Sequence, residues 1–296
     1  MKKPIFTGSG VAIITPFTED GAINFEELGK ILEFQIENET DAIIICGTTG
    51  ESAAMPDNEH LSVIDYTVKK VAGRIPVIAG TGSNDTAHGI NLCKEAESLG
   101  VDGLLTVTPY YNKTTQRGLV KHFTALANSV KIPIILYNVP SRTGVNIEPE
   151  TYARLAEHPM ITGIKEANGN IAKIVETKAL VGDKLDIWSG NDDQIVPILA
   201  AGGSGVISVL SNVLPKKTVE LCNKFFAGDV KGSMDMQCEM FDLIKALFCE
   251  VNPIPAKAAV AALGYCENYV RLPLTPMEKQ HEEVLLECMR KQGLKV

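Results

Sequence analysis

The sequence lacks the patterns that mark membrane, secreted and metal-binding chains. Gly, Pro or a charged residue interrupts each apolar run before the roughly 18–20 residues that a membrane-spanning helix needs. The segment after Met1-Lys2-Lys3 is too polar for a signal peptide. The seven cysteines and five histidines are scattered, without C-x-x-C, H-x-H or H-E-x-x-H. We therefore expect a cytoplasmic protein with reduced thiols and no metal site.

An excess of positive charge is absent as well. Lys and Arg number 28 against 36 Asp and Glu, which leaves a net charge of −8. Nucleic-acid binding requires a clustered positive surface, so neither nucleic acid nor a membrane is an expected partner. The chain has 296 residues, of which 45% are hydrophobic and 22% charged, and this composition excludes a disordered protein.

Short, nearly all-apolar segments recur along the chain and end in Gly, Thr, Tyr or another polar residue. Because they do not alternate with polar residues, they are typical of parallel strands that are buried on both faces. We expect eight strands, at 11–15, 42–46, 76–80, 103–107, 133–138, 161–166, 185–190 and 205–209.

Helical periodicity fills the intervals between these strands. Leu61, Ile64, Val68 and Val71, for example, fall on one face of a helix. Eight consecutive strand–helix units predict an α/β fold, a (β/α)8 TIM barrel. A doubly wound open sheet is the rival architecture, but no G-x-G-x-x-G turn follows the first strand.

Almost ninety residues follow the eighth strand. A helix near 215–227 completes the last unit, and further helical patterns cover about 234–248, 256–263 and 277–290. We therefore expect a barrel domain over 1–227, with its active site at the carboxyl ends of the strands, and a small C-terminal helical appendage over 228–296.

Lys165 is the first candidate for catalysis. It lies in an apolar strand, where burial disfavours the ammonium form and lowers the pKa of the amine. A neutral amine in a dry barrel is what a Schiff-base nucleophile requires. The alternative is a structural lysine that pairs with a carboxylate such as Glu166.

Further polar residues follow other strands at the same end of the predicted barrel. Tyr137 ends the preceding strand and can exchange protons with the Lys165 amine, or it is only an aromatic cap on the core. Thr48 and Thr49 form either a carboxylate-binding loop or a plain turn. Arg142 is either a carboxylate reader or a surface arginine.

No phosphate-binding site is indicated. In barrels such sites usually follow strands seven and eight, but the Gly190-Asn191-Asp192-Asp193 stretch here is acidic and repels phosphate. This argues against pyridoxal phosphate, flavin mononucleotide and sugar phosphates, so we expect no cofactor.

Several motifs in this order resemble those of one enzyme family. They are Gly-Thr-Thr-Gly-Glu at 47–51, Thr-Pro-Tyr-Tyr-Asn at 108–112, Tyr-Asn-Val-Pro-Ser-Arg-Thr-Gly at 137–144, Ile-Lys-Glu-Ala at 164–167, Asn-Pro-Ile-Pro at 252–255 and Leu-Pro-Leu-Thr-Pro at 272–276. Over essentially its whole length the chain is similar to the 4-hydroxy-tetrahydrodipicolinate synthase (dihydrodipicolinate synthase) family, within the class I pyruvate aldolase and N-acetylneuraminate lyase superfamily.

The resemblance implies a lyase that condenses pyruvate with L-aspartate 4-semialdehyde to 4-hydroxy-tetrahydrodipicolinate, in the diaminopimelate route to lysine. Pyruvate would form a Schiff base with Lys165, tautomerise to an enamine and attack the aldehyde, and the adduct would cyclise. Tyr137 would shuttle protons through Thr49 and Tyr111. Substrate contacts would come from Thr48, Thr49, Arg142, Gly190 and Ile207, with Thr48 and Thr49 on the pyruvate carboxylate and Arg142 on the semialdehyde carboxylate.

The family likeness also implies assembly and regulation. Tyr111 would enter the active site of a neighbouring subunit, and the expected assembly is a homotetramer built as a dimer of dimers. Regulated relatives bind lysine at the dimer interface, and Ser52, His60, Asn84 and Tyr110 match that pattern. Asp57 and His88 depart from it, because sensitive bacterial members typically carry histidine and glutamate there. We therefore expect weak or absent lysine inhibition.

Two alternatives to this function stay open at the level of the sequence. One is an N-acetylneuraminate lyase or keto-deoxy-sugar aldolase, which shares the lysine and tyrosine. The Ser-Arg-Thr-Gly at 141–144 is better suited to a short carboxylated aldehyde than to a polyol. The other is a non-catalytic barrel scaffold, which the intact lysine, tyrosine and threonine set disfavours.

Overall fold

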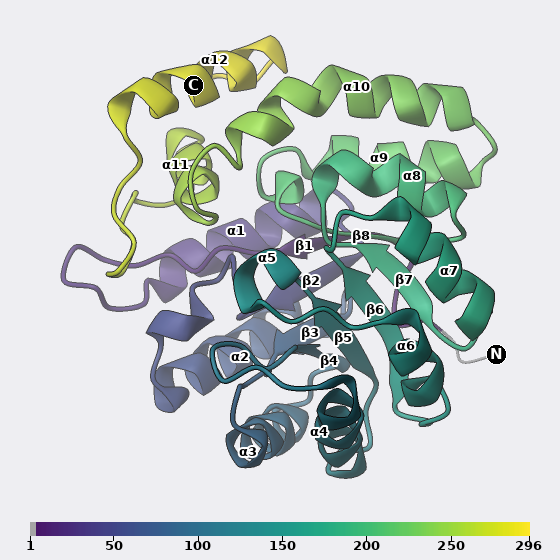
Figure 1. The fold of residues 1–296 in the computed structure, drawn as a ribbon. Coiled ribbons are helices and arrows are strands. Elements are labelled where there is room, and N and C mark those ends of the chain that lie inside the picture. The colour runs from purple at the N-terminus through teal and green to yellow at the C-terminus, as the bar shows by residue number, and fades with distance from the viewer. Residues whose placement is uncertain (1–3) are drawn as a thin grey trace.

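Eight parallel strands close into a barrel in the computed structural model, which describes residues 4–296. Neighbours in the barrel are also neighbours in the chain, and β8 pairs back onto β1. The fold expected from the sequence is confirmed (Figure 1). The strands are β1 Gly8–Ala12, β2 Ala42–Ile45, β3 Val77–Gly80, β4 Gly103–Val107, β5 Ile134–Asn138, β6 Ile161–Glu166, β7 Asp186–Ser189 and β8 Gly205–Ser208.

The first strand is the one whose position differs most from the expectation. The apolar run predicts a strand over 11–15, but β1 begins at Gly8 and ends at Ala12. Gly8 and Gly10 pair with Gly205 and Ile207 of β8, so barrel closure, rather than side-chain propensity, makes this glycine-rich segment a strand. Ile13 still donates its N–H to the carbonyl of Ile44 at 3.2 Å.

Apolar side chains fill the barrel on both sides of its wall. Inside, Ile44, Ile78, Leu105 and Ile135 pack with Trp188 in one buried cluster. A second and larger cluster fills the space between the strands and the surrounding helices. Because both faces of each strand are covered, the strands read as unbroken apolar runs.

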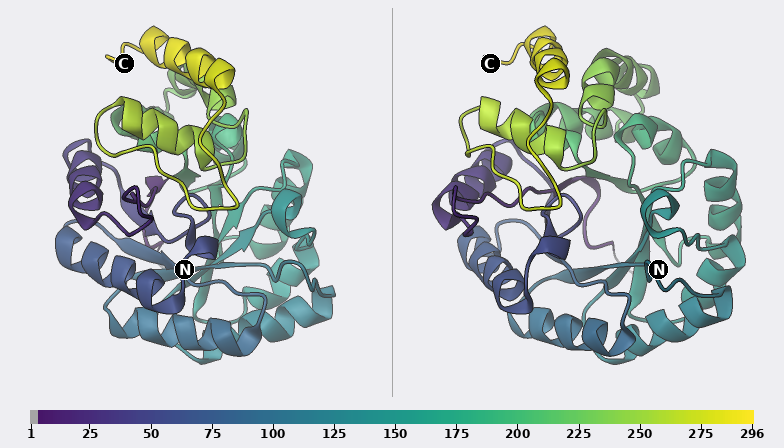
Figure 2. Two further views of the ribbon diagram at one scale, coloured as in Figure 1. Left: turned by 90° about the vertical axis from the view of Figure 1, so that its left-hand side faces the viewer. Right: turned by 60° about the vertical axis from the view of Figure 1, so that its left-hand side comes forward.

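Helices surround the barrel, and Figure 2 shows them as a ring. Several begin at a capping side chain: Asp85 accepts from the N–H of Ala87 at 2.8 Å, and Thr115 accepts from that of Gly118 at 3.2 Å. The helices are α1 Phe25–Glu37, α2 Asp57–Val71, α3 Thr86–Ser98, α4 Gln116–Asn128, α5 Pro140–Thr143, α6 Pro149–Leu155, α7 Ile171–Val181, α8 Ile195–Ala200 and α9 Pro215–Phe226, with 3-10 turns η1 Ser52–Ala54, η2 Asp192–Gln194 and η3 Leu210–Asn212.

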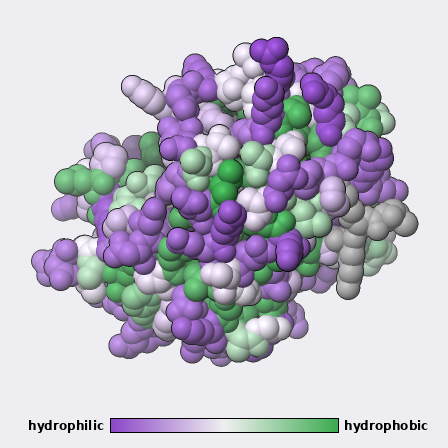
Figure 3. Space-filling view, turned by 90° about the horizontal axis from the view of Figure 1, so that it is seen from below, coloured by the Kyte–Doolittle hydropathy of each residue, from purple (hydrophilic) through white to green (hydrophobic). Residues whose placement is uncertain are grey.

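The surface over this ring is mostly polar. Seen from the side that carries α3 and α4, hydrophilic side chains dominate and hydrophobic ones lie between them in small groups (Figure 3). Within residues 4–296, no helix combines the length and the apolar character needed to cross a bilayer.

Three helices follow the barrel: α10 Val230–Ala246, α11 Ile254–Ala262 and α12 Lys279–Lys291. They stack outside the ring in both views of Figure 2, and α10 packs on α8 and α9. A separate hydrophobic core joins α8 and α9 to these helices. The C-terminal helical appendage is thus confirmed, although α10 begins four residues before the expected 234, where Asp229 caps it. The division into domains 1–227 and 228–296 stays a prediction.

Barrel closure generates a test of the fold. Gly205 has φ +149, and a Cβ there would lie 1.9 Å from the carbonyl oxygen of Gly8 on β1. We expect Gly205→Ala to lower the free energy of unfolding by more than about 3 kcal/mol, because the β1–β8 ladder must separate. Urea denaturation measures this loss.

Gly21→Ala is the matched control. Gly21 also has positive φ, at +83, but nothing lies within 4 Å of the position of its Cβ. We expect it to cost only about 1–2 kcal/mol, the strain of the backbone conformation alone. Equal losses in the two variants would show that closure does not depend on the Gly8–Gly205 approach.

Candidate active site

Lys165 lies inside the barrel, near the carboxyl end of β6. Its backbone pairs with Tyr137 of β5 on one side and Trp188 of β7 on the other. The side chain is only 5% exposed, and Nζ lies 4.4 Å from the centroid of the Tyr137 ring. Burial lowers the pKa of this amine to about 7, opposed by the charge of Asp192 and aided by that of Arg142. A substantial neutral fraction is therefore present near neutral pH.

Glu166 does not pair with this amine. Successive residues of a strand point to opposite faces, so Glu166 lies on the outer side of β6. Its carboxylate accepts hydrogen bonds from Asn138 Nδ2 and the Tyr152 hydroxyl, each at 2.9 Å, and from the N–H of Asn168 at 2.9 Å. The structure therefore contains no ion pair between Lys165 and Glu166, which was the structural alternative for this lysine.

Tyr137 and Thr48 contact each other beside Lys165. Burial raises the pKa of the Tyr137 hydroxyl, while the charge of Arg142 and a hydrogen bond with the Thr48 side chain act in the opposite direction. The relay expected through Thr49 therefore differs from this geometry. The Thr49 hydroxyl is buried and accepts from Asn252 Nδ2 at 3.0 Å, so Thr48 is the threonine that contacts Tyr137.

A small cavity of about 60 Å3 lies at this end of the barrel. Thr48 and Tyr137 line it together with Ser52 and His60. The loop that contributes Thr48 is bound to the segment after β1, because Thr15 Oγ1 donates to the Gly50 carbonyl at 2.8 Å. The cavity thus has a phenol and a hydroxyl in its wall, and the Lys165 amine lies against the ring of the same tyrosine.

Arg142 lies at the rim of the site. It belongs to the short helix α5, which follows β5 directly and begins at Pro140. Its side chain is exposed, Nη2 donates to the carbonyl of Asn252 at 3.1 Å, and its charge acts on both Tyr137 and Lys165. A guanidinium in this position is available to a carboxylate that enters from solvent.

Gly190 and Ile207, the other two expected substrate contacts, lie at the end of β7 and in β8. Ile207 is buried in the same interior cluster as Tyr137. Gly190 follows β7 and donates its N–H to the Glu166 carbonyl at 2.7 Å. A Cβ at Gly190 would lie 2.8 Å from that of Ala167, so only glycine allows the two loops to approach this closely.

Two further residues, Asp192 and Asn252, influence the site, and the sequence did not predict their contacts. Asp192 is buried, accepts from the N–H groups of Val209 and Leu210 at 3.0 and 2.9 Å, and keeps one carboxylate oxygen, Oδ1, without a hydrogen-bond partner. Its acidic neighbourhood was visible in the sequence, but its approach to Lys165 was not. Asn252 lies far along the chain from Thr49, and only its place in the Asn-Pro-Ile-Pro motif signalled it.

Tyr111 lies away from this cavity. The side chain is 92% exposed, and the backbone adopts the left-handed conformation, with φ +66. Exposure of this extent is unusual for a tyrosine, and positive φ in a residue other than glycine is strained. Within this one chain, therefore, Tyr111 and Tyr137 are not brought together.

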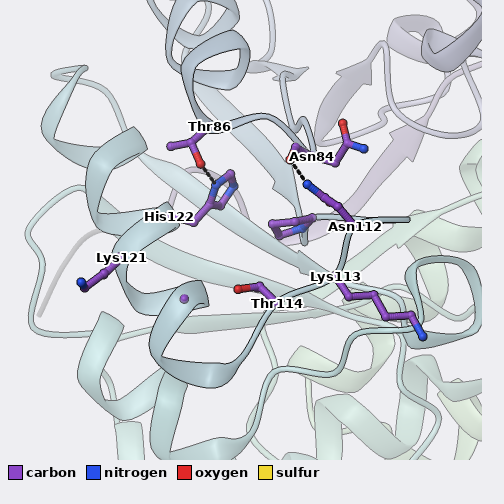
Figure 4. Close-up of a pocket in the computed structure, with 9 residues that line it drawn as sticks. Asn84, Thr86, Asn112, Lys113, Thr114, Lys121 and His122 are labelled. Atoms are coloured by element: carbon purple, nitrogen blue, oxygen red, sulfur yellow. Dashed lines mark hydrogen bonds between the residues drawn. The ribbon is translucent and has the colours of Figure 1, made fainter.

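The four residues of the expected regulatory site are partly brought together. Ser52 and His60 share the small cavity, and burial lowers the pKa of His60, whose Nε2 lies 2.8 Å from the Gly80 carbonyl. Asn84 lines a separate hollow of about 260 Å3 between α3 and α4, where Asn112 Nδ2 donates to its carbonyl at 2.9 Å (Figure 4). Tyr110 is exposed, in the loop between β4 and α4.

The two departures from the regulated pattern contact each other. His88 Nε2 lies 3.0 and 3.1 Å from the two carboxylate oxygens of Asp57, and its Nδ1 lies 3.0 Å from Ser83 Oγ. Both ring nitrogens of His88 and both oxygens of Asp57 therefore have partners inside the chain.

Thiols and acidic groups form no metal centre in the part of the chain that the structure describes. The seven cysteines are free, and Cys46, Cys93, Cys222, Cys266 and Cys288 are buried. Across residues 4–296, no three His, Cys, Asp or Glu side chains are close enough to hold a metal ion. A metal-free and cofactor-free reaction stays a prediction.

Comparisons with known proteins agree with this geometry. The model of the dihydrodipicolinate synthetase family matches residues 5–292. The 4-hydroxy-tetrahydrodipicolinate synthase of Acetivibrio thermocellus is 55% identical over 99% of this chain and 100% of its own length. The crystal structure of dihydrodipicolinate synthase from Thermotoga maritima superimposes with a TM-score of 0.97 at 44% identity, covering 99% of this chain and 100% of that one. The chloride-inhibited dihydrodipicolinate synthase of Acinetobacter baumannii, solved with pyruvate, has a TM-score of 0.96 at 41% identity, covering 98% and 99%. The chain therefore belongs to the dihydrodipicolinate synthetase family of enzymes.

Proposed function

We propose that this chain condenses pyruvate with L-aspartate 4-semialdehyde to 4-hydroxy-tetrahydrodipicolinate, in the diaminopimelate route to lysine. The observation that carries the proposal is the buried Lys165, whose amine has a pKa near 7 and lies beside Tyr137. The names of the relatives and the pyruvate complex of the Acinetobacter baumannii enzyme support it. We also place the reaction in the cytoplasm.

The first half of the reaction forms the nucleophile. The neutral Lys165 amine attacks the C2 carbonyl of pyruvate, and loss of water leaves a protonated imine. The Tyr137 hydroxyl supplies the proton that the departing water needs. Loss of a proton from the methyl carbon then gives an enamine, and Asp192 provides negative charge near the cationic nitrogen.

The second half forms the carbon–carbon bond and the ring. The enamine carbon attacks the aldehyde, and the resulting alkoxide takes a proton from the relay. The amino group of the semialdehyde then attacks the imine carbon, which closes the ring and releases the Lys165 amine. The chain thus returns to its starting state without a metal or a cofactor.

Different parts of the site bind the carboxylates of the two substrates. The loop with Thr48 and Thr49 takes the pyruvate carboxylate, since it lies inside the barrel beside Tyr137. Arg142 takes the carboxylate of the semialdehyde, because it lies at the open rim. A polyol substrate offers Arg142 no charge to pair with, so the sugar-aldolase alternative is not favoured.

The proton relay is completed by a second copy of the chain. We propose that it runs from Tyr137 through Thr48 to Tyr111 of a partner subunit, because Tyr111 is exposed and held in a strained conformation far from its own site. The active assembly is then a homotetramer, a dimer of dimers. Sedimentation of the full chain tests this assembly, and an active monomer would contradict it.

Lysine regulates this enzyme weakly or not at all in our proposal. Asp57 and His88 bond to each other, so the Asp57 carboxylate is not free to bind the ammonium group of a lysine ligand. Position 88 itself carries no carboxylate.

Replacing Lys165 tests the nucleophile. With pyruvate and borohydride, the wild-type chain is expected to gain the mass of a reduced pyruvate adduct on the Lys165 peptide. Lys165→Ala and Lys165→Arg should abolish both the adduct and turnover without unfolding the barrel. Lys173→Ala, which removes a surface lysine of α7, is the control and should retain both. Turnover that survives in Lys165→Ala would rule out the Schiff base, and a wild-type chain without an adduct would favour the scaffold alternative.

The pH dependence of adduct formation tests the environment of the amine. Below a pKa of about 7 the amine is protonated, so the trapping rate should fall about tenfold per pH unit and level off above pH 7. Asp192→Asn removes a negative charge that favours the ammonium form, so the midpoint should move to lower pH. A midpoint near that of a solvent-exposed lysine would contradict the proposed burial effect.

Lysine inhibition is tested by initial rates at increasing lysine concentration. We expect little loss of rate in the wild-type chain at millimolar lysine. The double variant Asp57→His with His88→Glu restores the residues of sensitive relatives and should become inhibited. Full inhibition of the wild-type chain would show that the Asp57–His88 pair opens for the ligand.

A further inference from the structure

Lys257 brings a charge into the most apolar of the C-terminal helices. Its side chain is completely buried in α11, among Ile254, Ala258 and Ala259. Nζ forms an ion pair with Glu51 Oε1 and lies 4.2 Å from the centroid of the Phe17 ring. A buried ammonium without a partner is strongly destabilising, so the contact with Glu51 is a condition for burying Lys257. Replacement of both ions by apolar side chains is often tolerated, however, so stability alone does not explain the pair.

Glu51 belongs to the loop that carries the two threonines. It follows Thr49-Gly50 directly and adopts a left-handed backbone conformation, with φ +54. Such a conformation persists in a residue other than glycine only where its surroundings hold it. Both carboxylate oxygens of Glu51 are engaged by the C-terminal segment: Oε1 by Lys257, and Oε2 by the N–H of Arg271 at 3.0 Å.

A third contact joins the same segment to the loop. Asn252, in the turn before α11, donates from Nδ2 to Thr49 Oγ1 at 3.0 Å, and its carbonyl accepts from Arg142 at 3.1 Å. The C-terminal segment therefore touches the loop at Thr49 and at Glu51, and the rim arginine as well. More than 200 residues separate each pair of partners between segment and loop.

We propose that Lys257 and Asn252 are positioning residues, which hold the Thr48–Thr49 loop in the conformation that binds the carboxylate of a 2-oxo acid. This inference rests on the proposed function, since it takes that loop as the pyruvate-binding element. Neither residue contacts a reacting atom. Their loss should therefore weaken pyruvate binding while leaving the chemistry at Lys165 largely intact.

The experiment measures how borohydride trapping on Lys165 depends on pyruvate concentration, together with KM and kcat. The main variant is Lys257→Met with Glu51→Leu, which removes both charges and leaves no unpaired ion. We expect it to fold, to need about tenfold more pyruvate for half-maximal trapping, and to keep kcat within about threefold at saturation. Asn252→Ala is the second variant and should raise the pyruvate requirement in the same direction, so a double variant that fails to fold does not end the test.

Leu243→Ala is the matched control for general destabilisation. Leu243 is buried in the C-terminal core between α10 and its neighbours, and its truncation should lower stability without touching the loop. Its pyruvate dependence should equal that of the wild-type chain.

The outcomes distinguish failure of the proposed function from failure of the positioning role. A wild-type chain that traps no pyruvate overturns the proposed function. A wild-type chain that traps pyruvate, with a folded double variant or Asn252→Ala that traps it at wild-type concentrations, overturns the positioning role alone. A raised pyruvate requirement that Leu243→Ala shares would assign the effect to stability and also overturn it.

Discussion

Burying the amino group of a lysine costs free energy, and this molecule buries two such groups in different surroundings. Burial lowers the pKa of the Lys257 amine, and the ion pair with Glu51 opposes that lowering. Lys165 has an aromatic ring and a more distant carboxylate around it, and its pKa falls to about 7. The first lysine contacts the loop after β2, and the second is the nucleophile of the proposed reaction. The proposed chemistry depends on this difference between a paired and an unpaired amine.

The closed barrel makes that difference possible. Alternation along β6 turns Lys165 inward and Glu166 outward, so adjacent residues of opposite charge do not neutralise each other. Glu166 is then satisfied by Asn138 and Tyr152 on the outer side of the strand. Inside, the apolar layer around Trp188 excludes water from the amine. Lys165 and Glu166 are adjacent in the sequence, but the strand geometry gives their side chains different surroundings.

The C-terminal helices are part of the site as well as part of the core. The barrel ends at β8, yet Asn252, Lys257 and Arg271 all form hydrogen bonds with the loop after β2. Arg142 donates a hydrogen bond to the carbonyl of Asn252 in the same segment. The loop expected to bind the pyruvate carboxylate and the arginine expected to bind the semialdehyde carboxylate therefore both contact one segment of the chain beyond the barrel.

The barrel, the C-terminal helices and the burial of Lys165 could be predicted from the sequence, because buried parallel strands and a lysine within one of them leave local patterns that can be read directly. The same patterns misplaced β1, whose glycines form a strand only because β8 lies beside them. The family resemblance implied a relay through Thr49, whereas Thr48 is the threonine that bonds to Tyr137 in this structure, and the contacts of Asp192 and Lys257 were not predicted. Those depend on which side chains meet across the closed barrel, at separations that reach 206 residues, and only the tertiary structure brings such residues together.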